Sequence, residues 1–595
     1  MARGGPPRVV VSVIVGSGRG LAARPAFEAG RPVPLLRRAQ GTATVGDLVT
    51  VRERGRTAEV LGVHGPTSSP TAVMSALLAN AGIRVELPSK ATGEADAITG
   101  RLGRGDPGRR DMTDQVAVTI DPEGAKDHDD AIAVAREGED IRLWVHIADV
   151  ARYVIPGGAI DREAARRGNS VYVPGMVAPM LPPRLSNDLC SLRPGEPRDV
   201  VTAEMVVHPD GTVSGERFYR SEILSRERLT YTTVDEVLAG AAPGPDGLGE
   251  SITLAAEAAR RLLARRRARG TLEVHSGEPS FTVSATRVEG GGLEAQTTSH
   301  SLVEECMIAA NEAVARFLVA RRAPTVFRYH EDPAGSAVAR MYDQLAELGV
   351  PVPPIADGPL GPQQAREAVA AAAEALRAHL ATLGDDGGRA GPALWGLVLR
   401  SLRQAYYSPD HVGHSGLASP AYLHFTSPIR RYPDLLVHRA LLDQLGIGDA
   451  GPDPATCAEA AAHSSETERE AVRMERRADR VTAALLLERL TGEKAIGLEH
   501  EGIVSGVIDG GLFVTFGEVF DGFLPVRRLG ADWFRTHPLE VGLIGESTGR
   551  RVMIGDPITV RIVRIEPLRG RVELEPAALG PSRVVARRRA RLGGA

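Results

Sequence analysis

The sequence contains very little cysteine and almost no lysine. Cys190, Cys306 and Cys457 are too few and too scattered along 595 residues for a disulfide framework or a thiolate zinc site, so a reducing cytoplasm fits best and we expect a cytoplasmic protein. Lysine occurs at three positions only, and the formal net charge is −4. Overall charge therefore gives no indication of nucleic-acid binding, which would have to come from local clusters.

The chain also lacks a long apolar run. No segment is long enough to span a bilayer, and the first 20 residues show no cleavage-site pattern, so we expect no membrane association. Apolar residues make up 43% and charged residues 25% of the chain, which is typical of a folded globular protein. At 595 residues, several domains are expected.

Changes in pattern along the chain predict five regions. Short β-rich runs indicate an N-terminal OB-like (cold-shock-like) barrel over 1–70, followed by a helix and a Gly-, Asp- and Arg-rich linker over 71–112. Mixed strands and helices indicate a large α/β domain over 113–490, which closes with a long helix at 457–490. Period-two strands predict an OB-type barrel over 496–578, and 579–595 reads as a basic tail.

The densest group of charges is acidic. Residues 121–130, directly after a predicted strand at 116–120, contain four aspartates, Asp121, Asp127, Asp129 and Asp130. Carboxylates this close raise one another's pKa unless solvent separates them or a hard cation neutralises them. The segment lacks the spacing of a calcium EF-hand. It is either an exposed acidic turn or a site for Mg²⁺, whose natural use is phosphoryl chemistry.

A second group of charges lies at residues 424–434. Ser427 and Pro428 fit the N-cap and first turn of a helix, which would direct free N–H groups at an anion. Arg430 and Arg431 could then bind a phosphate, although such a pair is more often a surface feature, and Pro433 conflicts with a helix that begins so early.

A pair of glutamates, Glu304 and Glu305, also has a structural interpretation. Residues 301–304 have the pattern of a capping box, which makes Glu304 structural and leaves Glu305 as the freer of the two.

Taken together, these segments resemble the ribonuclease II and ribonuclease R (RNB) family, both in their order and in their residues, over roughly 116–480. The resemblance rests on the acidic block and on the blocks at 145–150, 167–172, 179–182, 189–192, 304–311, 328–330, 426–432 and 438–439. The C-terminal barrel is similar to the S1-type RNA-binding domain that follows the catalytic domain in this family.

The resemblance implies a role for each matching residue. Four aspartates would bind Mg²⁺, or Mn²⁺ in its place, and position the attacking water, with Asp129 and Arg430 as the catalytic pair. Single-stranded RNA would contact other side chains by stacking, charge or hydrogen bonding. The metal set is Asp121, Asp127, Asp129 and Asp130; the RNA-binding set is Tyr172, Glu305, Arg430, Arg431 and Phe513, with Glu475 and Val274 as weaker matches.

The chain departs from the family pattern at several positions. Val274 stands where a bacterial relative often has a second stacking phenylalanine, and His128 stands where an apolar or aromatic residue is usual. Gly510 replaces one of two expected aromatics on the C-terminal barrel, which leaves Phe513 as the clearest stacking platform. The N-terminal region has room for one OB barrel where relatives have two. A weaker hold on RNA is the expected consequence.

The sequence therefore predicts a multidomain α+β protein in which a large mixed α/β RNB domain is flanked by small OB-type barrels. The predicted activity is 3′-to-5′ hydrolysis of single-stranded RNA to 5′-mononucleotides by a monomer, with two Mg²⁺ ions acting in an in-line displacement. The alternative is an RNA-binding or regulatory protein that keeps the fold with weak or no catalysis. An endonuclease or a DNA-directed nuclease is a third class, which circular RNA and DNA substrates would distinguish.

Overall fold

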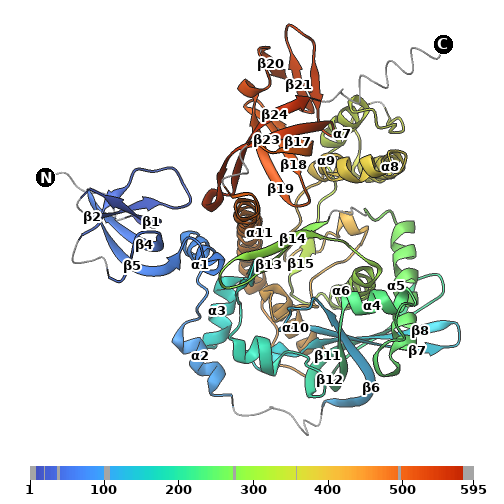
Figure 1. Ribbon diagram of the computed structural model, residues 1–595. Coiled ribbons are helices and arrows are strands. Elements are labelled where there is room, and N and C mark those ends of the chain that lie inside the picture. The colour runs from blue at the N-terminus through green and yellow to red at the C-terminus, as the bar shows by residue number, and fades with distance from the viewer. Residues whose placement is uncertain are drawn as a thin grey trace, which may run out of the picture.

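The computed structural model describes residues 8–18, 20–36, 41–98, 108–272, 277–356, 358–492 and 497–579. It has an N-terminal β-sheet, a large central domain built on a closed barrel, and a second closed barrel near the C-terminus (Figure 1). This is the mixed, multidomain α/β architecture that the sequence predicts. Val274 and the predicted basic tail from residue 580 onward lie outside the described residues.

The N-terminal sheet has the strand order β3-β2-β1-β4-β5. A parallel bridge between Leu35 and Ala58 links its two edges, and both of its faces are covered. One face packs around Ile14, while the other packs against helix α1, whose N-cap Ser69 accepts a hydrogen bond from the Ala72 N–H. The elements are β1 (Val9–Ser17), β2 (Gly20–Pro25), β3 (Val33–Pro34), β4 (Asp47–Arg54), β5 (Thr57–Pro66), α1 (Pro70–Asn80) and α2 (Ser89–Asp96).

The central domain is organised around a closed barrel in the order β11-β12-β6-β7-β8. Strands β12 and β6 run parallel, and the other neighbours are antiparallel. Helices α5 and α6 cover the barrel and share its core with Ile147, Val201 and Phe425. The barrel strands are β6 (Arg110–Asp121), β7 (Asp130–Glu137), β8 (Asp140–Ala148), β11 (Pro197–Val207) and β12 (Val213–Thr230).

Two short hairpins and the remaining helices surround this barrel. Helices α7 to α9 pack together beside the C-terminal barrel, and the 38-residue helix α11 extends from the central domain to that barrel (Figure 1). Asp453 caps α11, and the following Ala-, Glu- and Arg-rich stretch favours the helix. The elements are α3 (Ala159–Arg167), β9 (Val171–Val173), β10 (Met176–Ala178), α4 (Tyr231–Leu238), α5 (Gly249–Ala268), β13 (Glu278–Val283), β14 (Val288–Glu294), α6 (Thr298–Arg321), β15 (Phe327–Tyr329), α7 (Gly335–Glu347), α8 (Pro362–Ala381), α9 (Asp385–Ser401), β16 (Tyr406–Ser408), α10 (Tyr432–Gln444) and α11 (Pro454–Thr491).

The C-terminal barrel closes in the order β17-β18-β19-β24-β23. Alternate residues such as Leu512 and Val514 are fully buried in its core, whereas Phe513 between them points outward. The strands are β17 (Glu499–Ile508), β18 (Gly511–Phe516), β19 (Phe520–Pro525), β23 (Pro557–Glu566) and β24 (Arg571–Leu579), with a small added sheet of β20 (Phe534–Thr536), β21 (Gly542–Gly545) and β22 (Arg551–Met553).

Three local predictions are wrong. Helix α10 begins at Tyr432, not at Ser427, because Pro433 is tolerated only in a first turn. Helix α6 begins at Thr298, with Thr297 and His300 forming its capping box, so residues 301–304 lie inside the helix. Part of the predicted linker is helical, since α2 occupies residues 89–96. Among the described residues, no helix has the length and apolar character needed to cross a membrane.

Candidate active site

The four aspartates lie where the barrel strands β6 and β7 meet. Strand β6 ends at Asp121 and β7 begins at Asp130, and Val118 pairs with Ile132 in antiparallel register. The connecting loop therefore returns to the same end of the barrel and brings carboxylates from both strand ends together. Asp129 is buried and the other three aspartates are half-buried, so the acidic group is not an exposed turn.

Asp129 is the most deeply buried of the four. Its side chain is 4% exposed, and its Oδ1 accepts a hydrogen bond from the Ile429 N–H at 2.9 Å. Its Oδ2 has no hydrogen-bond partner among the described residues, and the Nε of Arg430 lies 3.6 Å away. Burial raises the pKa of Asp129 well above its usual value, and the carboxylates of Asp127 and Asp130 raise it further against the opposing charge of Arg430.

The other three carboxylates have different surroundings. Burial and the charge of Asp121 raise the pKa of Asp130 to about 7. The Oδ2 of Asp121 lies 2.8 Å from Nδ1 of the buried His128, and the Oδ2 of Asp127 accepts a hydrogen bond from the Tyr172 hydroxyl at 2.8 Å. The sequence pattern gave no role to His128, whose only signal was that it departs from the family pattern.

Arg430 is presented by a turn that precedes α10. The Ser427 carbonyl accepts hydrogen bonds from the Arg430 and Arg431 N–H groups, and the buried Asp434 carboxylate accepts one from the Ser427 N–H at 2.8 Å. Asp434 also accepts two hydrogen bonds from the Arg431 guanidinium, at 2.7 and 2.9 Å. The two arginines therefore do not form a phosphate-binding pair: Arg431 holds the turn, and Arg430, whose side chain is 46% exposed, faces the aspartates.

Tyr172 projects from the short strand β9 and links the aspartates to helix α11. Its hydroxyl donates to Asp127, and its backbone N–H donates to Glu475 Oε1 at 3.0 Å. Burial and the nearby Asp127 raise the pKa of the Tyr172 hydroxyl, so it stays protonated as a donor. Burial also raises the pKa of Glu475, which lies near the acidic Glu278.

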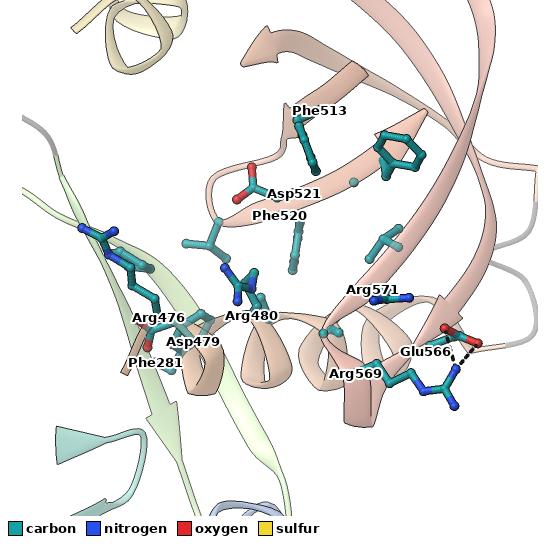
Figure 2. A pocket seen from close by; sticks show the side chains of 18 of the residues that line it. Phe281, Arg476, Asp479, Arg480, Phe513, Phe520, Asp521, Glu566, Arg569 and Arg571 are labelled. Carbon is teal, nitrogen blue, oxygen red and sulfur yellow. Dashed lines mark hydrogen bonds and ion pairs between the residues drawn. The ribbon is translucent and has the colours of Figure 1, made fainter. Parts of the chain in front are cut away.

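A cavity of about 1570 Å³ begins at Tyr172, Arg430 and Glu475 and continues between α11, hairpin β13–β14 and the C-terminal barrel. Figure 2 shows Arg476, Asp479 and Arg480 of α11 facing this space, with Phe513 and Phe520 across it on the barrel. The cavity therefore joins the aspartate end of the central domain to the aromatic face of the barrel.

Phe513 does not stand alone on that face. Phe523 is its direct cross-strand partner on β19, and the two ring centroids are 5.4 Å apart. A Cβ at Gly510 would lie 3.7 Å from the Phe523 ring, so this ring extends beside the glycine that replaces an expected aromatic. Phe523 is not among the residues predicted from the sequence, although its alternation with Gly522 and Leu524 could have placed it on the outer face.

The RNB domain family matches residues 109–446, and the S1 RNA binding domain family matches residues 493–575. The first match covers more than half of the chain.

The chain belongs to the RNB family.

Related RNB proteins from bacteria agree with this assignment. Ribonuclease R 1 of Lactococcus lactis is 33% identical over 516 residues, which cover 84% of this chain and 60% of that protein. Ribonuclease R of Escherichia coli is 37% identical over 472 residues, or 76% of this chain and 56% of that protein. Ribonuclease R of Thermotoga maritima is 34% identical over 508 residues, which cover 82% of this chain and 68% of that protein. The chain thus spans less than two thirds of the length of the first two relatives.

Solved RNB structures share the fold. The apo form of Mycoplasma genitalium RNase R has a TM-score of 0.83 at 25% identity, covering 96% of this chain and 89% of that chain. The same protein in complex with ribose-methylated single-stranded RNA has a TM-score of 0.84 at 24% identity, with the same coverage. Yeast Ssd1, a pseudonuclease, has a TM-score of 0.65 at 17% identity and covers 91% and 68%. The RNB fold therefore occurs with and without nuclease activity.

The glutamates of α6 differ from their prediction. Glu305 is 2% exposed and forms an ion pair with the buried Arg266 at 2.9 Å, whereas the side chain of Glu304 is 53% exposed. The prediction that Glu305 is the freer glutamate is therefore wrong, because residues 301–304 do not cap the helix and α6 turns Glu305 toward α5. A direct contact of Glu305 with RNA remains a prediction.

The chemistry of the four aspartates fits a hard divalent cation. They supply only oxygen donors, and the buried Asp129 Oδ2 lacks a hydrogen-bond partner within the described part of the chain. Two of the carboxylates are held by His128 and Tyr172, and over the described ranges no three His, Cys, Asp or Glu side chains already converge at metal-binding distance. Binding a cation would therefore require these side chains to move.

Proposed function

We propose that this chain is a 3′-to-5′ exoribonuclease that hydrolyses single-stranded RNA to 5′-mononucleotides. The observation that carries the proposal is the position of the four aspartates beside Tyr172 and Arg430, which line one end of a cavity of about 1570 Å³ whose other end is an aromatic barrel face. A single strand could extend along such a cavity while its 3′ end reaches the carboxylates. Bacterial relatives that align with about three quarters or more of this chain are ribonucleases by name.

We propose Mg²⁺, with Mn²⁺ as an alternative, as the cofactor, held by Asp121, Asp127, Asp129 and Asp130. The ion would supply activation of water and stabilisation of charge on the phosphate. The raised pKa values of Asp129 and Asp130 support this assignment, because mutual repulsion of buried carboxylates is relieved by a cation.

The chain's own residues would position the RNA. Arg430, half-exposed and aimed at the aspartates, is placed to bind the scissile phosphate and to stabilise charge that develops on it. Tyr172 offers an aromatic ring at the same end of the cavity for the terminal base. At the far end, Phe513 and Phe523 offer a surface on which bases can stack whatever the RNA sequence.

The test is release of mononucleotides from end-labelled oligo(A) by the purified protein in Mg²⁺. A ladder that shortens from the 3′ end with a mononucleotide product supports the proposal. Circular RNA should resist cleavage, since it has no 3′ end, and single-stranded DNA should be a poor substrate. Cleavage of the circle would identify an endonuclease instead.

A protein that binds RNA without cleaving it is the second candidate, and the likeness to yeast Ssd1 favours considering it. The complete set of four aspartates with Arg430 argues against it. Binding of oligo(A) without any product in Mg²⁺ or Mn²⁺ would support the second candidate.

A further inference from the structure

The cavity holds an aromatic side chain, outside the C-terminal barrel, that has been given no role so far. Phe281 lies on strand β13, is half-buried, and lines the same cavity as Tyr172 and Arg430. Figure 2 shows it on the hairpin side of the cavity, across from the barrel and next to Arg476 and Asp479 of α11. It thus belongs neither to the acidic loop nor to the aromatic face of the barrel.

The Phe281 ring packs against the glycine backbone of the hairpin. Gly291 is its direct cross-strand partner, within a run of three glycines on β14. A Cβ at Gly291 would lie 2.6 Å from the ring and 3.2 Å from Leu486 of α11. Glycine at position 291 therefore lets the ring lie close against the hairpin, and Phe281 still lines the cavity.

Other contacts fix the hairpin beside Tyr172. A Cβ at Gly175, in the turn that joins β9 to β10, would meet Val283 at 3.2 Å, so the two hairpins touch. At the same turn end of the hairpin, the Arg489 guanidinium of α11 donates to the Glu289 carbonyl at 2.8 Å, and the Ser69 hydroxyl donates to the Ala285 carbonyl at 3.0 Å. Hairpin β13–β14 is thus held by α11, α1 and the β9–β10 turn.

We propose that Phe281 is a base-stacking site for single-stranded RNA inside the cavity, between Tyr172 and the Phe513–Phe523 face. This inference rests on the proposed function, because it assumes that RNA occupies the cavity. An aromatic ring accepts any base, since every base has a π-face. Position 274 of this chain is valine, which implies weaker binding of RNA. The Phe281 ring would offset that loss.

The test is binding of oligo(A) that carries one 2-aminopurine, whose fluorescence is quenched by stacking, at successive positions from the 3′ end. EDTA is present so that the RNA stays intact. Wild-type protein should quench the probe at an interior position, and Phe281→Leu, which keeps apolar bulk, should abolish the quenching at that position and weaken binding by about fivefold or more. Phe281→Trp should restore both.

Two further variants separate stacking from a general loss of structure. Phe317→Leu removes another half-buried phenylalanine, which packs on Phe218 and Arg321 outside the cavity, and should change neither quenching nor affinity. Gly291→Ala, which displaces the ring without removing it, should weaken quenching at the same position as Phe281→Leu. All variants should share the wild-type melting temperature to within a few degrees.

The outcomes separate this inference from the proposed function. If wild type releases mononucleotides in Mg²⁺ but Phe281→Leu matches it in affinity and in quenching at every position, the stacking site is overturned and the exonuclease stands. If wild type binds and quenches through Phe281 without releasing product, the exonuclease proposal fails and the stacking site stands. If wild type does not bind the RNA at all, both fail.

Discussion

Replacing Asp130 by Asn should stabilise the metal-free protein at alkaline pH. Asp130 has a pKa of about 7 in the folded protein against an ordinary value of 3.8. Between these two values the unfolded chain loses a proton that the folded protein keeps, so the stability contributed by Asp130 is fully present below pH 3.8 and falls as pH rises to about 7. Asparagine has the same shape but does not ionise, so the variant lacks this loss.

The size of the effect follows from the two pKa values. At about 1.36 kcal/mol per pH unit, the gap from 3.8 to 7 sets an upper limit of about 4 kcal/mol. Asp121 shares the repulsion and can relax, so we expect roughly 2 kcal/mol at pH 8 and about 1 kcal/mol or less at pH 5. The melting temperature of Asp130→Asn in EDTA should exceed that of wild type by several degrees at pH 8, with a smaller difference at pH 5.

Asp114→Asn is the matched control, because Asp114 is exposed on β6 outside the acidic loop, and its melting curve should follow wild type at both pH values. Adding Mg²⁺ at pH 8 should raise the melting temperature of wild type more than that of Asp130→Asn, because a cation that binds only the folded site stabilises it. Parallel melting temperatures for wild type and Asp130→Asn between pH 5 and pH 8 would refute the inference that burial and the charge of Asp121 raise the pKa of Asp130.

Four further changes test other parts of the protein. Arg430→Ala should lower kcat by about 10²- to 10³-fold, because the guanidinium stabilises charge that develops in the transition state. A change confined to KM would show that Arg430 only binds the RNA. Tyr172→Ala should lengthen the end product of 5′-labelled oligo(A) and Val274→Phe should shorten it, because each stacked base contributes roughly 1 to 3 kcal/mol; equal product lengths on a denaturing gel would exclude both residues from the clamp. Deleting residues 499–595 should weaken binding of long RNA and flatten its salt dependence while short oligomers are still cleaved, and an unchanged salt slope would show that the barrel does not contact RNA.

Local patterns in the sequence located most of the elements. The period-two strands of the C-terminal barrel, the long helix predicted at residues 457–490 and the strand predicted at residues 116–120 all form. The last two are parts of α11 (Pro454–Thr491) and β6 (Arg110–Asp121). These segments have strong periodicity and clear boundaries, and local pattern is sufficient for them. The fold class follows from the same signals.

Predictions failed where the local pattern does not show which partner or which of two signals decides the structure. Asp434 is the only neighbour in sequence that could have shown that the Arg431 guanidinium is held within its own turn. The partner of Glu305 is Arg266 of α5, which the sequence around Glu305 does not show. The start of α10 depended on the choice between Ser427 and the later Pro433, and the proline decided it. Phe281 carried no motif at all, since its place in the cavity results from how the hairpin packs on α11.

The central claim is that the four aspartates catalyse hydrolysis at the end of the cavity. It is tested most directly by incubating 5′-labelled oligo(A) with wild type and with Asp129→Asn in Mg²⁺, and by measuring oligo(A) binding of both proteins in EDTA. The account predicts mononucleotide release by wild type, a loss of most of that release in Asp129→Asn, and affinities that agree within about threefold, because the RNA contacts lie elsewhere in the cavity. Release by Asp129→Asn at the wild-type rate would contradict it.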